Sequence, residues 1–383
     1  MHCSPRVRSL TTAVTVALVL AAAGCGGGGG HARARAKAPV TTTTSSTPPS
    51  STTAAPVVNV YAHTTPGDLS PAVAGVPTRV YVPNSQSNTV DVIDPATFQV
   101  VDHFATGGLP QHVVPSWDLK TLYVNNNTGN SLTPIDPRTA KPGPRIPIED
   151  PYNLYFTPDG TKAVVMAERN SEIDFRDPHT WKLVKGLHIP HRGVNHADFS
   201  ADGSTMFAST EFSGFVVRVD LASMELTGEV QVGGKPVDVK LSPDGKLIYV
   251  ANETRNGVSV IDPSAMKEVG FIPTGSGTHG LYPSRDATNL YATNRTGGSI
   301  SVISFATRAV IATWPIGGSP DMGGVSTDGT QLWLSGRYNS EVYVIDTTTG
   351  QRIHTIKVGA GPHGLCLFPQ PGRYSMGHTG NYR

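Results

Sequence analysis

The feature that most constrains the fold of this chain is an internal repeat of about 42 residues. Two markers recur from Val80 onward at different phases but with one shared period. The first is an aspartate in a turn of the type SPDG, found at Asp118, Asp159, Asp202, Asp244, Asp286 and Asp328, with Gln370 in the seventh place. The second ends a strand of the type VSVID and stands at Asp94, Asp136, Asp177, Asp220, Asp262, Ser304 and Asp346. Because chance alternation would not keep phase over seven copies, the chain is predicted to be a repeat array.

One copy, from Val232 to Gly275, shows what each unit contains. It holds four short runs rich in alternating β-branched residues, VDVKLS, LIYVA, GVSVID and KEVGFI, which are separated by turn residues. Four strands in such a unit correspond to one blade of a β-propeller. The 41 Gly and 31 Pro in 383 residues suit many short strands and argue against a helical bundle. The sequence therefore predicts an all-β, seven-bladed propeller of four-stranded antiparallel blades.

The two ends of the repeat array predict how the ring closes. Residues 80–104 supply the second, third and fourth strands of a blade but no first strand. Residues 363–368 supply a first strand with no further strands of the usual length after it. We therefore predict a closing blade of three strands plus one from both chain ends, which leaves no open edge in the ring.

The segment before the repeats has the character of an export signal and a tether. Within residues 1–25, Arg6 and Arg8 precede an apolar run that is too short to span a membrane. The sequence Ala-Ala-Gly-Cys that ends at Cys25 resembles the lipobox of bacterial lipoproteins, which implies a lipid on Cys25. Residues 26–67 are rich in Gly, Thr, Ser and Pro and predict an extended tether, followed by the propeller at 68–383. We expect the protein outside the cytoplasm, lipid-anchored at the cell envelope.

Charge and cysteine content limit the partners. All 29 Asp and Glu lie from Asp68 onward, whereas 5 of the 30 Lys and Arg precede it, so residues 68–383 carry 25 basic against 29 acidic side chains. With no basic surplus, nucleic acid is not an expected partner. The cysteines are Cys3, Cys25 and Cys366, which leaves no disulfide framework within the propeller. We expect a monomer that touches the membrane only through its lipid.

The strings IYVANETRNGVSVID, VYVPNSQSNTVDVID and GGKPVDVKLSPDGK resemble the YVTN-repeat family of seven-bladed propellers. The resemblance covers essentially the whole folded domain and implies its fold. It does not imply one function, because related propellers serve as surface-layer modules, nucleic-acid binders, cofactor-bearing oxidoreductase subunits and lyases. The chain has no CxxCH motif, so covalent c-type haem is not expected.

Aligning the seven units places one ring of side chains around one face of the propeller. The loop between the second and third strands opens on the same face as the loop that leads into the innermost strand, and we name this the loop face. The first of these loops contributes Ser85, Asn127, Glu168, Glu211, Glu253, Arg295 and Arg337. Three consecutive blades carry Glu and the next two carry Arg, so the ring is segregated by sign.

The start of the innermost strand supplies a second level of side chains. The aligned pairs are Gln111 and His112, Tyr152 and Asn153, Asn195 and His196, Val237 and Asp238, His279 and Gly280, Asp321 and Met322, and His363 and Gly364. Four of the 13 histidines occupy this level. Because successive residues of a strand point to opposite sides, these histidines need not converge, which limits any prediction of a four-histidine metal cage.

Together these levels predict a site at the mouth of the central channel. An acidic arc of Glu168, Glu211, Glu253, Asp238 and His196 faces a basic arc of Arg295 and Arg337, with His112, His279 and His363 nearby. Clustered carboxylates hold cations and guanidinium groups hold carboxylates or phosphates, so we expect a small polar or zwitterionic ligand, or an envelope protein. The alternative is that these charges pair with adjacent loops and bind nothing.

Two other functions stay open at the same face. One is a lyase or hydrolase assisted by a divalent metal, with His196 and Glu211 as catalytic candidates. The other is a redox subunit that carries copper or a quinone-type cofactor. The sequence assembles no ligand set for either cofactor.

Overall fold

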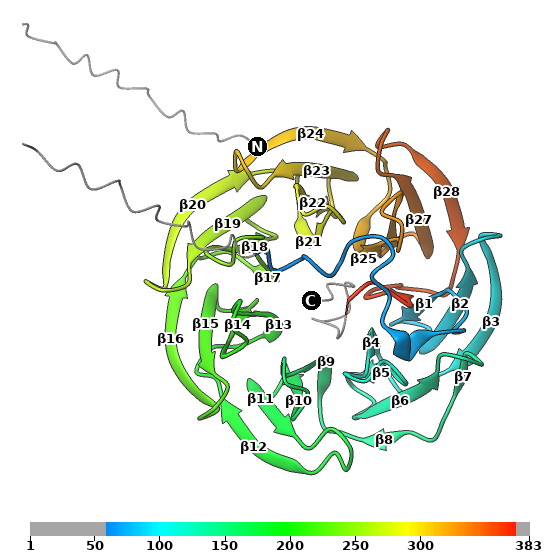
Figure 1. Cartoon of the computed structure of the whole chain (residues 1–383), viewed down its shortest axis with the longest axis horizontal. Coiled ribbons are helices and arrows are strands. Elements are labelled where there is room, and N and C mark those ends of the chain that lie inside the picture. The colour runs from blue at the N-terminus through cyan, green and yellow to red at the C-terminus, as the bar shows by residue number, and fades with distance from the viewer. Residues whose placement is uncertain (1–58, 373–383) are drawn as a thin grey trace, which may run out of the picture. The chain divides into compact units, whose positions relative to one another are not determined.

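Seven antiparallel sheets stand around a central axis in the computed structural model, which describes residues 59–372 (Figure 1). This arrangement confirms the predicted seven-bladed propeller. Apart from one 3₁₀ turn, η1 (Pro71–Val73), the described residues form only strands, turns and loops. No helix in this part of the chain is long and apolar enough to cross a membrane. The predicted signal peptide, Cys25 and the tail from residue 373 lie outside the described residues.

The blades are numbered 1 to 7 around the ring, and the strands of each are given from the axis outward. Blade 1 is β29 (Cys366–Phe368), β1 (Arg79–Asn84), β2 (Thr89–Asp94) and β3 (Gln99–Ala105); blade 2 is β4 (Pro110–Pro115), β5 (Leu122–Asn126), β6 (Ser131–Asp136), β7 (Lys141–Pro142) and β8 (Ile146–Pro147). Blade 3 is β9 (Pro151–Phe156), β10 (Ala163–Ala167), β11 (Glu172–Arg176) and β12 (Leu183–His188); blade 4 is β13 (Val194–Phe199), β14 (Thr205–Thr210), β15 (Phe215–Asp220) and β16 (Glu225–Gln231). Blade 5 is β17 (Pro236–Leu241), β18 (Ile248–Asn252), β19 (Gly257–Asp262) and β20 (Lys267–Pro273); blade 6 is β21 (Thr278–Pro283), β22 (Asn289–Asn294), β23 (Ser299–Ser304) and β24 (Ala309–Pro315). Blade 7 is β25 (Pro320–Val325), β26 (Gln331–Gly336), β27 (Glu341–Asp346) and β28 (Arg352–Lys357).

The ring closes through both ends of the described chain, as predicted. Strand β29 pairs antiparallel with β1, with Leu367 opposite Val80. Blade 2 departs from the predicted four strands because its outer edge is divided into β7 and β8, both of which pair with β6. Pro142, Gly143 and Pro144 stand at this break, and proline removes backbone donors from a ladder.

The hydrophobic core is divided into seven clusters, one between each pair of neighbouring blades. Phe175 of β11 and Phe199 of β13 are buried together between blades 3 and 4. Trp333 of β26 is buried between blade 7 and blade 1, in the cluster that seals the closure. Since each blade buries both faces in this way, the axis is surrounded by rigid inner strands.

The aspartates of the SPDG-type turns have a structural role, because each stabilises its own turn by hydrogen bonds. In blade 5, Ser242 Oγ donates to Asp244 Oδ1 at 2.6 Å, and the Lys246 amide donates to the same oxygen at 3.2 Å. Six such turns, each pairing a Ser or Thr with its Asp, join the first and second strands of their blades. Asp side chains are suited to this role because they bond backbone two residues on. We name the face that carries these turns the turn face, and it lies opposite the loop face.

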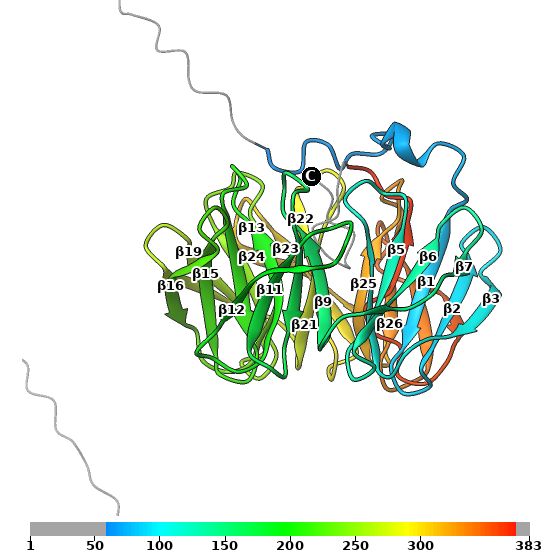
Figure 2. The same ribbon diagram turned by 90° about the horizontal axis from the view of Figure 1, so that it is seen from below.

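The chain before the first blade, residues 59–76, crosses the turn face as a strap (Figure 2). The Val60 amide donates to the Pro243 carbonyl at 2.9 Å, and the buried Tyr61 hydroxyl donates to the Leu241 carbonyl at 2.7 Å. Packing against the ring therefore begins upstream of residue 68, where the sequence pattern placed the start of the propeller.

Candidate functional site

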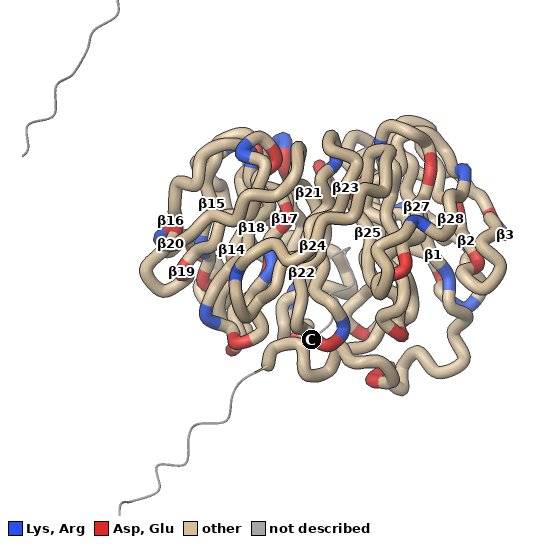
Figure 3. The backbone as a smooth tube through the Cα atoms, turned by 90° about the horizontal axis from the view of Figure 1, so that it is seen from above, with Lys and Arg blue, Asp and Glu red and all other residues tan. Residues whose placement is uncertain are grey.

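The ring of side chains on the loop face is fixed by a repeated backbone hydrogen bond. In six blades, the ring residue donates its amide hydrogen to a carbonyl of the loop that leads into the inner strand of the same blade. The donors are Ser85, Asn127, Glu211, Glu253, Arg295 and Arg337. The two loops therefore open on one face. Charged residues gather at the turns and loops on the two faces, while the middles of the strands are mostly uncharged (Figure 3).

A β-bulge at the start of the inner strands sets the second level of side chains. In β17, Pro236 pairs with Asn252 but Val239 pairs with Val250, so two residues of β17 oppose one of β18. The same shift occurs in the inner strands of blades 2, 4, 6 and 7. A bulge re-aims side chains, so simple alternation along the strand does not hold here.

The four histidines converge on the axis, three of them from bulged inner strands and His363 from the segment just before β29. Ring centroids lie 5.8 Å apart for His279 and His363, 4.8 Å for His363 and His112, and 5.4 Å for His112 and His196. Tyr152 joins them, with its ring 5.3 Å from that of His112. Strand alternation did not predict this cluster.

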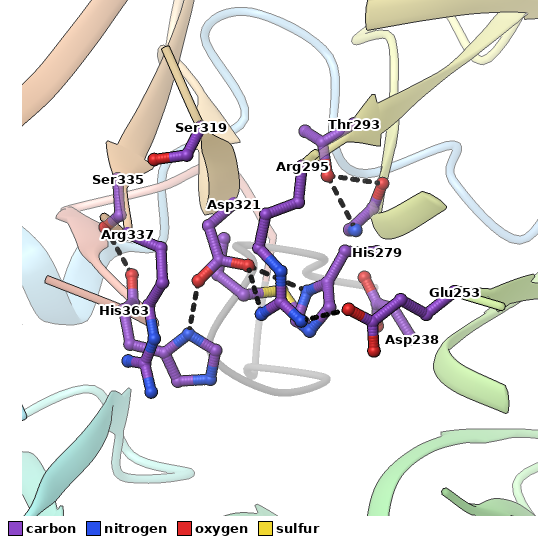
Figure 4. A network of polar contacts seen from close by, with 12 residues as sticks. Asp238, Glu253, His279, Thr293, Arg295, Ser319, Asp321, Ser335, Arg337 and His363 are labelled. Carbon is purple, nitrogen blue, oxygen red and sulfur yellow. Dashed lines mark hydrogen bonds and ion pairs between the residues drawn. The ribbon is translucent and has the colours of Figure 1, made fainter. Parts of the chain in front are cut away.

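Asp321 is the centre of a polar network among these residues (Figure 4). Its carboxylate is fully buried, and Oδ2 lies 2.7 Å from His363 Nδ1. Its other oxygen, Oδ1, lies 3.0 Å from His279 Nδ1 and accepts a hydrogen bond from Arg295 Nη1 at 3.2 Å. Burial opposes ionisation of Asp321, but His279 and Arg295 outweigh that cost and hold its pKa well below the ordinary value.

Arg295 is neutralised within the protein. Its Nη2 lies 2.5 Å from Glu253 Oε1, and its Nη1 contacts Asp321. Burial disfavours the charged guanidinium, but Asp321 and Glu253 raise its pKa above the usual value. One guanidinium therefore compensates two carboxylates, so Arg295 and Glu253, predicted on facing arcs, form a direct pair between neighbouring blades.

Arg337 is held differently. Its Nη1 donates to Ser85 Oγ at 3.0 Å and to the Gly361 carbonyl at 3.3 Å. Among residues 59–372, no carboxylate forms an ion pair with it. Burial is the main cause of the lowered pKa of His363, and the Arg337 charge lowers it further; the same charge opposes the rise that burial causes in the pKa of Tyr152. Arg337 is thus a basic group that faces the axis with its charge not compensated by a paired acid.

The acidic side of the ring is a pair of carboxylates joined by one amide. Asn195 Nδ2 donates to Glu168 Oε1 at 3.1 Å and to Glu211 Oε2 at 2.8 Å. Burial, with added repulsion from Glu211, raises the pKa of Glu168 to about 8, and burial also raises that of Glu211. The pair lies in blades 3 and 4, on the opposite side of the axis from Arg337 in blade 7 (Figure 1).

His363 and Tyr152 lie between these two sides. The Tyr152 hydroxyl is 3.4 Å from His363 Nε2. Burial and Arg337 lower the pKa of His363 to about 3, so its imidazole is neutral at pH 7. Since Nδ1 faces the Asp321 carboxylate, the proton stays on Nδ1 and the lone pair on Nε2 faces Tyr152. Burial first, and then Glu168 and Glu211, raise the pKa of Tyr152 well above its usual value.

Asp238, which was predicted to lie in the acidic arc, is engaged in contacts within blade 5 and with blade 6. Its Oδ2 accepts the Leu281 amide of blade 6 at 2.8 Å, and its Oδ1 pairs with the buried Lys240 Nζ at 2.8 Å. His196 is fully buried, with Nδ1 2.9 Å from Asn195 Oδ1. Burial, followed by His279 and His363, holds the pKa of His196 well below its usual value.

Three residues that were not singled out from sequence are central to the site: Tyr152, Asn195 and Asp321. Each occupies the aligned position that holds His279 and His363, so the alignment itself contained the signal. Within the described residues, no group of three or more His, Cys, Asp or Glu is arranged to hold a metal ion.

Comparisons with known proteins show what this chain is similar to. The sequence pattern of the YNCE-like beta-propeller family matches residues 51–372. No curated protein sequence matches the chain. A solved structure from Desulfotomaculum acetoxidans DSM 771, described as functionally unknown, is 16% identical with a TM-score of 0.65 and covers 76% of this chain and 98% of its own.

Two other similar structures have named functions. Hydrazine synthase of Kuenenia stuttgartiensis is 18% identical with a TM-score of 0.58, and the match covers 66% of this chain and 87% of that chain. The dihydro-heme d1 dehydrogenase NirN in complex with DHE is 16% identical with a TM-score of 0.57, and the match covers 76% of this chain and 75% of that chain. At such identities, these similarities show the fold alone.

Proposed function

The chain belongs to the YNCE-like beta-propeller family, and on this scaffold we propose a binding protein that holds a small zwitterionic ligand across the axis at the loop face. The carboxylate of the ligand contacts Arg337, and its ammonium group contacts Glu211 and Glu168. The observation that carries this proposal is the position of the charges. Arg337, which has no paired acid, lies on the opposite side of the axis from Glu168 and Glu211, the two carboxylates that Asn195 bridges.

Each end of the site suits its proposed partner. The Arg337 guanidinium is held through Nη1, and guanidinium groups bind carboxylates through paired N–H donors. On the other side, a bound ammonium group favours the charged form of the carboxylates, so its binding would release the proton that burial keeps on Glu168 at neutral pH.

Binding is tested by ligand-dependent thermal stabilisation, with amino acids of graded length as probes: glycine, β-alanine and 4-aminobutyrate. Propionate and propylamine carry only one of the two charges and serve as matched controls. We expect a zwitterion to stabilise the protein more than either control, by about 2.7 kcal/mol at 100 times its Kd. The same stabilisation by propionate alone as by β-alanine would contradict a two-ended site.

Variants assign the two ends. Arg337→Ala should abolish stabilisation by the zwitterions and by propionate, whereas Glu211→Gln should weaken binding of the zwitterions and of propylamine only. Arg145→Ala removes an exposed arginine in the outer edge of blade 2 and should leave every response unchanged. If the Arg337 variant responds as the parent does, the proposed site is wrong.

We further propose that the protein belongs to the YVTN-repeat group and acts at the cell envelope as a monomer, anchored by a lipid on Cys25. The lipobox-like sequence that ends at Cys25 supports the anchor. Metabolic labelling with a fatty acid tests it: the parent should incorporate label, and Cys25→Ala should not. Equal incorporation by both proteins would rule out this anchor.

A further inference from the structure

The buried groups beneath the charged ring point to a chemical activity that rests on the ligand site proposed above. Asp321 Oδ2 is 2.7 Å from His363 Nδ1, and the Tyr152 hydroxyl is 3.4 Å from Nε2 of the same imidazole. We infer that Tyr152, His363 and Asp321 form a proton relay, which exchanges the proton on the carbon next to the carboxylate of the bound ligand.

The three groups have the arrangement that acid–base catalysis needs. A group that exchanges protons, a base in reach of it and a carboxylate that orients the base are the signature of an activated side chain. The 3.4 Å separation of Tyr152 and His363 is long for a hydrogen bond, but such contacts are often loose before a ligand binds. Burial and Arg337 lower the pKa of His363, so its imidazolium exists only during the transfer, and the Asp321 carboxylate, which acts against both causes, stabilises it there.

The orientation of Asp321 is fixed from its other side. Its second oxygen contacts His279 Nδ1 and Arg295 Nη1, so the first oxygen stays directed at His363. Asp321 is therefore a positioning residue, and it does not touch the ligand. The side chains of His363 and Asp321 are 2% and 0% exposed, which excludes water and strengthens the interactions among them.

The proposed step balances without any further reagent. The ligand C–H bond breaks, and its proton moves to the Tyr152 oxygen while the Tyr152 proton moves to His363 Nε2. The electron pair of the broken bond passes into the ligand carboxylate, which Arg337 holds. Arg337 also stabilises the negative charge that Tyr152 shares during the transfer, because it favours the ionised form of this hydroxyl. Tyr152 is 7% exposed, so its hydroxyl, which now carries the ligand's proton, exchanges that proton for a deuteron of heavy water. The reverse step then returns the deuteron from the Tyr152 oxygen to the carbon, and His363 gives its proton back to Tyr152.

The test is hydrogen exchange into the bound amino acid, followed by ¹H NMR in heavy water. The full chain is incubated with glycine, β-alanine or 4-aminobutyrate, and the signal of the carbon next to the carboxylate is measured over time. We expect this signal to decay with the parent protein. Tyr152→Phe and His363→Gln should each slow the decay by about 100-fold or more, while they retain thermal stabilisation by the ligand.

Two further variants separate chemistry from structure. Tyr291→Phe removes a buried hydroxyl of β22 in blade 6 and should exchange at the parent rate. Asp321→Asn should slow exchange and shift its pH profile, because an amide no longer stabilises protonated His363. A variant with only a structural defect would lose activity without that shift.

The outcomes distinguish this inference from the function on which it rests. A probe that stabilises the protein but shows no exchange overturns the relay alone. If no zwitterion stabilises the protein, the ligand site fails and the relay fails with it. Hydrogen exchange at the parent rate in both Tyr152→Phe and His363→Gln would show that these two residues take no part in the reaction.

Discussion

Replacing Asp321 with Asn tests whether this buried carboxylate holds the centre of the site together. The substitution keeps the shape of the side chain and removes one negative charge. In the parent protein that charge faces His363, His279 and Arg295 in an environment closed to solvent. In the variant, the new side-chain amide offers one acceptor oxygen in place of two. Its NH₂ group then faces a donor, either His363 on one side or His279 and Arg295 on the other.

The magnitude follows from what remains unpaired. Arg295 keeps Glu253 but loses its second carboxylate, while either His363 or His279 loses its acceptor. Removing one partner of a buried charged pair costs about 3–5 kcal/mol. This is a large part of the roughly 5–15 kcal/mol that stabilises a typical folded domain. We therefore expect a loss of about 3–5 kcal/mol at pH 7.

Urea unfolding of both proteins, followed by tryptophan fluorescence, measures the difference. Its pH dependence adds a second check, because the pKa of Asp321 is lowered in the folded state. The stability that comes from such a carboxylate is present above its unfolded pKa of about 3.9 and is lost as the pH falls through the folded value. The difference in free energy of unfolding between the parent protein and the variant should therefore be largest at pH 7 and decrease below about pH 4.

Asp136→Asn is the matched control. Asp136 is exposed at the end of β6, where its carboxylate accepts hydrogen bonds from the Arg138 amide and the Thr139 hydroxyl, and an Asn side chain can still accept the first of them. Its substitution should change stability by less than about 0.5 kcal/mol. A loss below about 1 kcal/mol for Asp321→Asn, or a loss that does not depend on pH, would mean that the Asp321 charge does not hold the centre of the site together.

Three further predictions concern stability, measured by urea unfolding. Between about pH 4 and pH 8, the free energy of unfolding of Glu168→Gln should rise by a few kcal/mol relative to that of the parent protein. The reason is that burial raises the pKa of the Glu168 carboxyl to about 8, so this carboxyl increasingly destabilises the folded parent as the pH rises through that range. A difference between the two proteins that does not change with pH would contradict this. Gly323→Ala should destabilise by about 1–3 kcal/mol because its new Cβ would overlap the Trp333 carbonyl oxygen, whereas Gly186→Ala, with its nearest contact at 3.6 Å, should fold like the parent. Tyr282→Phe should cost about 1–3 kcal/mol, since the buried Gly323 amide loses its 2.8 Å acceptor; no loss would mean that water replaces the hydroxyl.

The sequence predicted the fold closely because the length and number of the repeats determine the size and number of the blades. Two markers with one period specified seven blades, and the missing first strand before Val80 specified the closure with β29. The break of the outer strand of blade 2 at Gly143 was not anticipated, although the prolines on either side were visible. The strap was also missed, because its composition differs little from that of the tether before it, and only contacts such as Val60 with Pro243 reveal it.

The candidate site was predicted in part. Alignment brought the charged ring and the inner level to one face, but it could not give the pairing between blades. Glu253 contacts Arg295, which lies 42 residues away, and Asp238 contacts the Leu281 amide, 43 residues away. A contact of this kind depends on side-chain direction, which the bulge in the inner strand changes. Repeat patterns fix positions around the axis but leave that direction open.

The closure of the ring has a consequence for the order in which the protein is completed during synthesis. Strand β29 is the innermost strand of the first blade, yet among the strands of residues 59–372 it is the last to leave the ribosome. His363 lies just before this strand, at the end of the same chain segment. Until these residues emerge, the first blade lacks its inner edge and Asp321 lacks one of its partners. Ring closure and assembly of the site are thus a single, final event, and a chain stopped before His363 lacks both.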